Sequence, residues 1–477
     1  MKNTKIIATI GPASRDQSTI EKMAKAGMNV CRLNFSFGTH DEHLETISII
    51  RKASKKTGIP IAIMQDLQGP KIRVGKLNSP VTVKEGQELI LSGNTKHNEE
   101  FYIPTTYSQI ASDTKKDKKI LLADGKIILK VLNTNSSKKE VRCKVIEGGT
   151  ILTGKGINLP YTNISLPCLT EKDIKDAKFG AKAGIDYMSL SFVRKAKDVE
   201  ALRKLLKDQG KENLPIVSKI EKPEAVDNID AIIDATDAIM IARGDLADEV
   251  SFAKVPLIQK KIVAKANKKG KSTIIATEML GSMVDNQLPT RAEVSDVANG
   301  VLDGADLVML SNETAMGKYP VKAVKMMAQI AEEAESTFEG EDFYRELDLP
   351  KIHGQRELLC SAASFMSYDL KNDNIVVFSL TGLTAKILSK FRPEATIFAA
   401  TYKEEVYHKM AFYNNVYPLL INKKDSIQFI PSMEEKLRKM KLINKGDTLI
   451  FLTAERINNT WTETNSIKVK SEERIHK

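Results

Sequence analysis

Short apolar runs alternate with longer amphipathic segments along most of the chain, a pattern that predicts parallel strands followed by helices. Runs suited to buried strands start near residues 5, 29, 59, 185, 214, 238, 272 and 305. Helical periodicity follows them at 18–26, 40–56, 172–183, 196–208, 256–269, 289–302 and 320–335. Eight such strands alternating with helices favour an α/β fold built on a (β/α)₈ TIM barrel. An open doubly wound sheet is the alternative, but no G-x-G-x-x-G follows the first strand.

The helical period disappears between residues 70 and 167, where alternating runs are separated by glycines. This pattern predicts a small β-barrel lid domain inserted after the third barrel strand. The barrel is then expected in two parts, 1–69 and 168–340. After a charged stretch at 339–354, four further strand-like runs alternate with helices. They predict a C-terminal α/β effector or oligomerisation domain over 341–477.

The formal net charge of +11 favours anionic partners through the overall field. The lysines are scattered and no basic run is interleaved with aromatic residues, so phosphorylated metabolites are expected in preference to nucleic acid. Cys31, Cys143, Cys168 and Cys360 lie far apart in no metal-ligand spacing, which predicts reduced thiols. With neither a signal-like start nor an apolar run of ~20 residues, a cytoplasmic protein without a membrane segment is expected.

Polar side chains follow two of the predicted strands. Lys219 and Glu221 end the run 214–220, and Arg243, Gly244 and Asp245 follow the run 238–242. Two carboxylates suit Mg²⁺ or Mn²⁺, and a neighbouring lysine suits a transferring phosphoryl group. The alternative is a surface salt bridge between Lys219 and Glu221.

Functional side chains of a (β/α)₈ barrel lie at the carboxyl ends of the strands. The other candidates at these ends are Arg32, Asn34, Ser36, Asp66 and Thr277. Arg32 suits an oxyanion, or alternatively caps strand-end carbonyls. A short helix starting at Gly244 is expected to offer free backbone N–H groups to an anion.

The residues that carry these expectations also resemble the pyruvate kinase family. The shared motifs include TKIIATIGPAS, MNVCRLNFSFGTH, QGPKIRVG, KGINLP, SKIEKPEAVDNIDAI, IMIARGDL, ATEMLGSM and SNETAMGKYPVKAV. The resemblance is strongest over residues 4–73 and 155–325 and weakens after about Ala454. It implies transfer of the phosphoryl group of phosphoenolpyruvate to ADP, giving pyruvate and ATP, by a homotetramer that needs Mg²⁺ or Mn²⁺.

The resemblance also implies roles for individual residues. Lys219, Arg32 and Thr277 would be catalytic, and Glu221 and Asp245 would bind the metal. Phosphoenolpyruvate would contact Arg32, Lys219, Gly244, Asp245 and Thr277, and nucleotide would contact Asn34, Arg73 and Lys155. In the C-terminal domain, hydroxyls and free N–H groups suit a phosphorylated effector at Ser379, Thr381, Gly382 and Thr384, with an ordinary helix N-cap as the alternative.

The chain departs from the family pattern at three places that affect these implications. Phe37 replaces a family histidine that contacts nucleotide, which puts that contact in doubt. Asn34, Ser36 and Asp66 match the family K⁺ site, but Leu67 replaces its threonine and Lys71 a family glutamate. We expect Lys71 to lie near Asp66 as a tethered cation and K⁺ not to be required. A solvated Lys71 at the lid hinge is the alternative.

Two competing functions remain open at this stage. A metal-dependent lyase or aldolase acting on phosphoenolpyruvate or pyruvate needs the same metal pair but no nucleotide lid, and the insertion with Arg73 and Lys155 argues against it. An inactive paralogue kept as an effector-binding subunit would have lost Lys219 or Glu221, and both are present.

Overall fold

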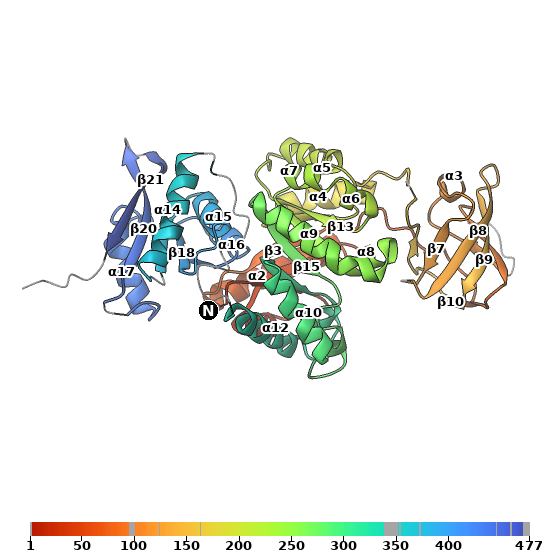
Figure 1. Cartoon of the computed structure of the whole chain (residues 1–477), viewed down its shortest axis with the longest axis horizontal. Coiled ribbons are helices and arrows are strands. Elements are labelled where there is room, and N and C mark those ends of the chain that lie inside the picture. The colour runs from red at the N-terminus through yellow and green to blue at the C-terminus, as the bar shows by residue number, and fades with distance from the viewer. Residues whose placement is uncertain are drawn as a thin grey trace, which may run out of the picture.

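A computed structural model describes residues 2–337, with gaps at 95–100, 124 and 163, and residues 352–470, with gaps at 353, 372–373, 445 and 458–459. Three bodies lie in a row along the long axis, with the barrel in the middle (Figure 1). The expected boundary at 340/341 and most of the expected linker at 339–354 lie outside the described residues.

The central body is a closed parallel barrel of eight strands in the order β1-β16-β15-β14-β13-β12-β3-β2. Its strands are β1 (Lys5–Thr9), β2 (Met28–Asn34), β3 (Ala62–Asp66), β12 (Tyr187–Leu190), β13 (Ile216–Ile220), β14 (Ala238–Ala242), β15 (Ser272–Ala276) and β16 (Leu307–Leu310). They are almost entirely buried, as continuous apolar strands of a parallel sheet must be. The predicted eight-stranded barrel is confirmed.

Helices between the strands form the outer layer (Figure 1). They are α1 (Gln17–Lys25), α2 (His40–Thr57), α4 (Glu171–Ala183), α5 (Ala196–Asp208), α6 (Pro223–Asp227), α7 (Ile229–Ala235), α8 (Arg243–Val250), α9 (Val255–Lys268), α10 (Arg291–Leu302), α11 (Asn312–Ala315) and α12 (Pro320–Glu335). Two 3₁₀ turns are η1 (Phe252–Lys254) and η2 (Gly281–Val284). Capping boxes at Thr39, Thr170 and Thr290 begin α2, α4 and α10, because each threonine hydroxyl accepts from an otherwise free backbone N–H.

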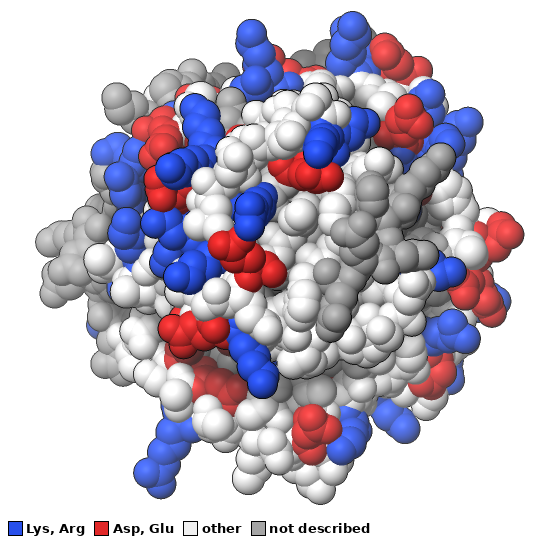
Figure 2. All heavy atoms as spheres, turned by 90° about the vertical axis from the view of Figure 1, so that its right-hand side faces the viewer, with Lys and Arg blue, Asp and Glu red and all other residues white. Residues whose placement is uncertain are grey.

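The inserted segment forms a six-stranded sheet, β11-β7-β8-β9-β5-β6, and a two-stranded sheet, β10-β4. Its elements are β4 (Val81–Val83), β5 (Glu88–Ser92), β6 (Tyr102–Pro104), α3 (Ile110–Asp113), β7 (Lys119–Leu122), β8 (Ile127–Asn135), β9 (Glu140–Glu147), β10 (Gly149–Ile151) and β11 (Ile157–Asn158). One apolar core lies inside this lid. The lid stands away from the barrel (Figure 1). On the face in Figure 2, acidic and basic side chains of the described residues are intermixed.

The C-terminal body is a five-stranded sheet in the order β19-β18-β17-β20-β21 with helices around it. It contains α14 (Gln355–Asp369), β17 (Asn374–Phe378), α15 (Leu383–Lys390), β18 (Thr396–Thr401), α16 (Glu404–Met410), β19 (Val416–Leu420), α17 (Phe429–Lys439), β20 (Leu449–Ile457) and β21 (Thr460–Lys470). The last strand was not predicted; it pairs antiparallel with β20. Part of this body shares an apolar core with the barrel strands. No described helix is both long and apolar enough to span a bilayer.

Candidate active site at the carboxyl end of the barrel

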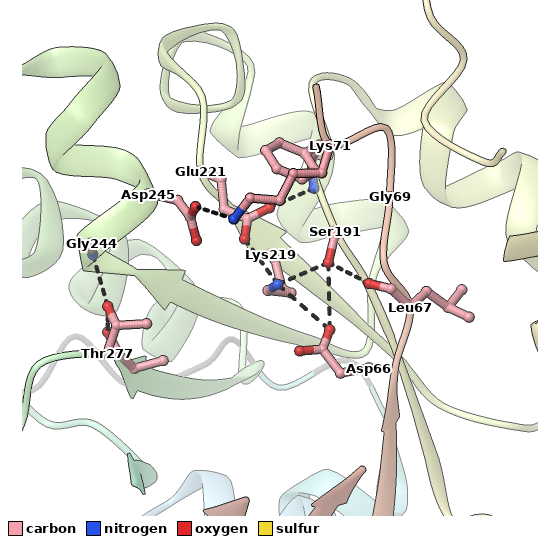
Figure 3. Close-up of polar contacts among 12 residues, drawn as sticks. Asp66, Leu67, Gly69, Lys71, Ser191, Lys219, Glu221, Gly244, Asp245 and Thr277 are labelled. Carbon is pink, nitrogen blue, oxygen red and sulfur yellow. Dashed lines mark hydrogen bonds and ion pairs between the residues drawn. The ribbon is translucent and has the colours of Figure 1, made fainter. Parts of the chain in front are cut away.

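Lys219 lies at the centre of a charged group at the carboxyl ends of the barrel strands (Figure 3). Its Nζ is 2.9 Å from Glu221 Oε1 and 3.5 Å from Asp66 Oδ1, and it donates to Ser191 Oγ at 2.8 Å. Burial alone would lower the pKa of Lys219, but Asp66 and Glu221 more than offset this and raise it. The ammonium is therefore a fixed positive charge, held before any substrate arrives.

The pKa values of the two carboxylates beside Lys219, Asp66 and Glu221, are shifted in opposite directions. Burial tends to raise the pKa of Asp66, but Lys219 and Arg32 outweigh burial and hold it below its usual range. Arg32 contributes the shortest contact, from Nη2 to Asp66 Oδ2 at 2.6 Å. For Glu221, burial raises the pKa, Lys219 opposes the rise, and nearby Asp245 adds to it. The negative charges of the two close carboxylates Glu221 and Asp245 favour a bound cation between them.

Glu221 and Asp245 come from the ends of neighbouring strands and face one another in Figure 3. Glu221 is buried and accepts from the backbone N–H of Phe192 at 2.7 Å, whereas the Asp245 side chain is 30% exposed toward the cleft. Among the described residues, no cluster of three or more His, Cys, Asp or Glu side chains has the geometry of a metal centre. Two oxygen ligands with room for others fit Mg²⁺, which usually takes one or two carboxylates and completes its shell with substrate oxygens and water.

Thr277 begins a strained turn directly after β15. Thr277 and Glu278 have φ values of 71° and 54°, the left-handed region that costs a non-glycine residue of order 1–3 kcal/mol. Arg243, for which the sequence indicated no role, holds the turn by donating from Nη2 to the carbonyls of Thr277 at 2.9 Å and Glu278 at 3.2 Å. Strain held by a partly buried arginine indicates that the position of Thr277 matters.

The backbone N–H of Gly244 is not free, contrary to expectation. It donates to Thr277 Oγ1 at 2.7 Å, and that hydroxyl donates to the carbonyl of Ala276 at 2.6 Å. The expected short helix does begin here, as α8, and the contact joins its first turn to the strained turn.

The sequence suggested that Lys71 lies beside Asp66, but the structure places it elsewhere. Its Nζ is 3.7 Å from Asp245 Oδ1, while the partners of Asp66 are Arg32 and Lys219. The lid hinge explains the difference, because Gly69 has φ 69° and its N–H donates to Asp173 Oδ1 at 3.1 Å. The turn carries the chain past the end of β12 and directs Lys71 toward Asp245 (Figure 3).

The remaining strand-end candidates lie at the ends of β2 and β3, where Asn34 pairs in register with Asp66. Asn34 Oδ1 accepts from the N–H of Ser36 at 3.0 Å. Phe37 follows with 69% of its surface exposed, and His43 Nε2 lies 2.9 Å from its carbonyl oxygen. An exposed phenylalanine therefore occupies the place of the family histidine.

Arg73 and Lys155 lie together on the lid. Arg73 bridges to Gly156 and donates from Nη1 to the carbonyl of Gly154 at 2.9 Å, while Lys155 is exposed. The structure gives neither side chain an ion pair with the barrel residues described above. One contact between the lid and the barrel is the hydrogen bond from Asn158 Nδ2 to Glu249 Oε1, at 3.3 Å.

The predicted effector loop lies between β17 and α15. Gly382, with φ 79°, is the N-cap of α15, and Thr381 Oγ1 accepts from the N–H of Leu383 at 3.3 Å. Thr384 is turned away, with its hydroxyl 2.9 Å from that of Thr464, and Ser379 is buried. Of the three predicted side chains, Thr381 is the exposed one.

Sequence reasoning missed Ser191 as part of this site, and it named Arg243 at a strand end without giving it a role. Ser191 directly follows β12, so its place after a barrel strand was the signal that could have identified it. Its hydroxyl links three elements, because it accepts from Lys219 and donates to the carbonyl of Leu67 at 2.7 Å. Arg243 lies next to Gly244, but nothing local to the sequence indicates that it reaches a turn more than thirty residues away.

Comparison with known proteins gives a consistent result over the whole chain. Residues 1–324 match the family model "Pyruvate kinase, barrel domain" and residues 357–470 match "Pyruvate kinase, alpha/beta domain". Pyruvate kinases of Clostridium acetobutylicum and Dictyostelium discoideum are each 40% identical over 98% of this chain, which covers 99% and 94% of their own lengths. A crystal structure of a pyruvate kinase from Cryptosporidium parvum has a TM-score of 0.92 at 34% identity, covering 98% of this chain and 96% of that chain.

Proposed function

The chain belongs to the pyruvate kinase family of phosphotransferases, and from this premise we propose that its strand-end site transfers the phosphoryl group of phosphoenolpyruvate to ADP. The β-phosphate oxygen of ADP forms the new P–O bond, the enol P–O bond breaks, and protonation of enolpyruvate at carbon gives pyruvate. The observation that carries this proposal is the buried Lys219 ammonium between Asp66 and Glu221, facing a two-carboxylate metal site.

Phosphoryl transfer depends on positioning and on charge neutralisation more than on covalent catalysis. Lys219 and Arg32 offer positive charge where the phosphoryl oxygens develop negative charge. Both are preorganised, because Asp66 holds Arg32 at 2.6 Å and Ser191 holds Lys219 at 2.8 Å. Glu221 and Asp245 would hold the divalent cation, which when bound neutralises phosphate and enolate oxygens. Thr277 is proposed to orient a water for the protonation of enolpyruvate.

The nucleotide is proposed to enter between the barrel and the lid. Arg73 and Lys155 are adjacent cations on the lid, and Asn34 lies at the barrel rim. Lid closure would bring the two cations onto the nucleotide phosphates and exclude water from the transfer. The contact between Asn158 and Glu249 beside the hinge is the pivot we expect for this motion.

A coupled assay tests the proposal directly. Pyruvate formation is followed with excess lactate dehydrogenase and NADH, with both phosphoenolpyruvate and ADP supplied. Pyruvate release that needs ADP supports transfer, whereas release without ADP would favour a lyase or phosphatase. No release under any condition would favour an inactive paralogue.

K⁺ is proposed not to be required, for a reason that differs from the one the sequence suggested. Asp66, a carboxylate of the family cation site, is already neutralised by Arg32 and Lys219. Lys71 adds another ammonium to the same cleft through its contact with Asp245. A further monovalent cation there meets like-charge repulsion.

A phosphorylated effector is proposed to bind at the loop before α15. The exposed Thr381 hydroxyl and the first N–H groups of the helix support an anion there. A neighbouring hollow lined by Phe378, Trp461 and Lys468 has room for the rest of such a molecule. Thr381→Ala should weaken activation in a screen of sugar phosphates and nucleotide monophosphates. An unchanged phosphoenolpyruvate saturation curve with every compound would contradict the site.

A homotetramer is also proposed from family membership. Phe252 and Leu257 support an interface, because they are 70% and 71% exposed within five residues of one another. Large apolar side chains exposed together are typical of protein contacts. Sedimentation equilibrium at micromolar concentration gives the test, and a monomer at all concentrations would reject it.

A further inference from the structure

Four lysines converge at the seam between the barrel and the C-terminal body, at the opposite end of the barrel from Lys219. Lys271 directly precedes β15 on the barrel side. Lys386 and Lys390 are one turn apart on α15, and Lys409 lies near the end of α16. All four are partly buried, so their ammonium groups share a region with little water.

A small pocket, partly open to solvent, lies within this seam. The barrel contributes Lys271 and Ser272, and the C-terminal body contributes Lys386, Lys390 and Arg392. The Lys390 side chain lies flat over Gly270, whose φ is 60°, and its Cδ is 2.5 Å from the place a Cβ would take. Glycine therefore lets Lys390 reach the pocket across the end of α9.

These lysines repel one another. Burial lowers the pKa values of Lys271, Lys390 and Lys409, and the next cause in each case is the charge of Lys386. Glu357 opposes the decrease for Lys390 without cancelling it. Asp237, Asp186 and Glu405 do the same for Lys409. A shared cause in three neighbouring groups indicates an uncompensated excess of positive charge.

The carboxylates near the pocket are already paired with other cations. Asp237 binds Arg203 at 2.7 Å, Asp234 binds Lys269 at 2.5 Å, and Asp306 binds Arg392 at 2.8 Å. Within the described ranges, Lys386 and Lys390 have no ion pair or side-chain hydrogen bond with the protein. Asp237 still acts on Lys386 at longer range, because the charge of Lys386 helps to lower the pKa of Asp237.

Capping of helix ends accounts for only part of this arrangement. Lys271 donates to the carbonyl of Thr236 at 2.7 Å, just after α7, as a lysine at a helix carboxyl end commonly does. Lys386 has no such acceptor, although it is the lysine that most perturbs the others. The cluster therefore has cationic donors in excess of what the protein uses.

We propose that this seam pocket is an anion site for inorganic phosphate or a compact phosphomonoester, held by Lys271, Lys386 and Lys390. A bound dianion would accept charge-assisted hydrogen bonds from both sides of the seam and remove the mutual repulsion of the lysines. It would tie the start of β15 to α15. The site is distinct from the strand-end site and from the loop that precedes α15.

Calorimetry and thermal unfolding of the full-length protein test the site, with inorganic phosphate as the probe and chloride at matched ionic strength as the reference. We expect phosphate to raise the Tm of the wild type. The variant K386Q/K390Q should bind phosphate at least about tenfold more weakly, the size expected when one hydrogen bond to a charged group is lost. Lys52→Gln, an exposed lysine on α2, is the matched control and should bind as the wild type does.

Two further variants locate the anion, because phosphate can also occupy other sites. Lys219→Met removes the cation of the strand-end site, and Thr381→Ala alters the effector loop. The proposal predicts that both keep the phosphate-dependent rise in Tm that K386Q/K390Q loses. The proposal is overturned if phosphate fails to stabilise the wild type. It is also overturned if K386Q/K390Q keeps the phosphate-dependent rise in Tm, whether or not Lys219→Met or Thr381→Ala loses that rise. Repeating the titration with glycerol phosphate separates the sources: tighter binding of inorganic phosphate assigns the free ion, and the reverse assigns a phosphomonoester.

Discussion

Replacing Lys219 by methionine separates the catalytic role of its ammonium from its structural one. The residue is 9% exposed, with Nζ 2.9 Å from Glu221 Oε1 and 3.5 Å from Asp66 Oδ1. Methionine keeps the unbranched apolar stem and removes only the charged end. Asp66 keeps Arg32 as a partner, but Glu221 loses its cation and keeps only the N–H of Phe192.

The size of both effects follows from this geometry. Removing one partner of a buried ion pair typically costs ~3–5 kcal/mol of stability, and we expect the lower end because Glu221 can accept a proton. Loss of a preorganised charge at the transferring group should lower kcat by ~10²–10³ or more. The variant is therefore expected to fold but to be nearly inactive.

The stability change should depend on pH in a defined direction. Burial already raises the pKa of Glu221 and Lys219 opposes the rise, so the variant should have a still higher pKa at this carboxyl. A carboxyl whose pKa is higher in the folded state binds its proton more tightly there, and that stabilisation is lost as pH rises through the folded value. The difference in unfolding free energy between wild type and Lys219→Met should therefore grow between pH 5, just above the ordinary value of 4.5, and pH 8.

Urea unfolding at the two pH values and the coupled pyruvate assay measure the two effects. Arg51→Met is the matched control, because Arg51 pairs with the buried Asp186 at 2.7 Å at the amino end of β12, away from Asp66 and Glu221. It should lose stability while kcat stays within about tenfold of the wild type. A Lys219→Met enzyme with kcat in that same range, or one whose stability deficit shrinks as pH rises, would refute the reasoning.

Three other predictions concern the metal, K⁺ and the domain seam. Glu221→Gln and Asp245→Asn should each raise the Mg²⁺ concentration needed for activity at least about tenfold, because each removes an anionic ligand. The Mg²⁺ concentration needed for thermal stabilisation should rise in the same way. Unchanged titrations would place the metal elsewhere. Wild-type activity should be the same with tetramethylammonium as with K⁺ at constant ionic strength, whereas Lys71→Glu should gain partial K⁺ dependence; strong activation of the wild type by K⁺ would contradict this. Arg392→Met should lower the free energy of unfolding by ~3 kcal/mol, because Asp306 is buried and Arg392 is its 2.8 Å partner; adding Asp306→Asn should restore most of the loss, and equal deficits in the single and double variants would argue against the pair.

The order of strands and the strand-end candidates could be predicted because they depend on local pattern. Continuous apolar runs with helices between them determine a closed parallel sheet, and β14 and β15 lie at the residues expected. Once the barrel is inferred, every residue just after a strand must lie at one rim. Lys219, Glu221 and Asp245 were identified in this way. The last strand, β21, was missed because its run is mostly polar and shows no clear alternation of apolar and polar residues. Its pairing with β20 is visible only in the structure.

Which partner each side chain takes was decided only by the tertiary structure. Lys71 was expected beside Asp66, yet the Gly69 turn, held by Asp173, directs it to Asp245. Arg243 reaches the carbonyls of the Thr277 turn from the preceding strand end. Periodicity specifies which face of an element a residue occupies, but it does not specify the backbone turns and rotamers that bring charges together.

The seam pocket shows the same limit at longer range. Lys271 and Lys386 are separated by more than a hundred residues and belong to different bodies, and in sequence each is one scattered lysine among many. Their mutual repulsion exists only because α15 packs against the start of β15. The sequence by itself determined the fold and the rim of the active site, because both follow from apolar period. The pairing of charges depended on packing between distant segments, and only the folded chain decides that.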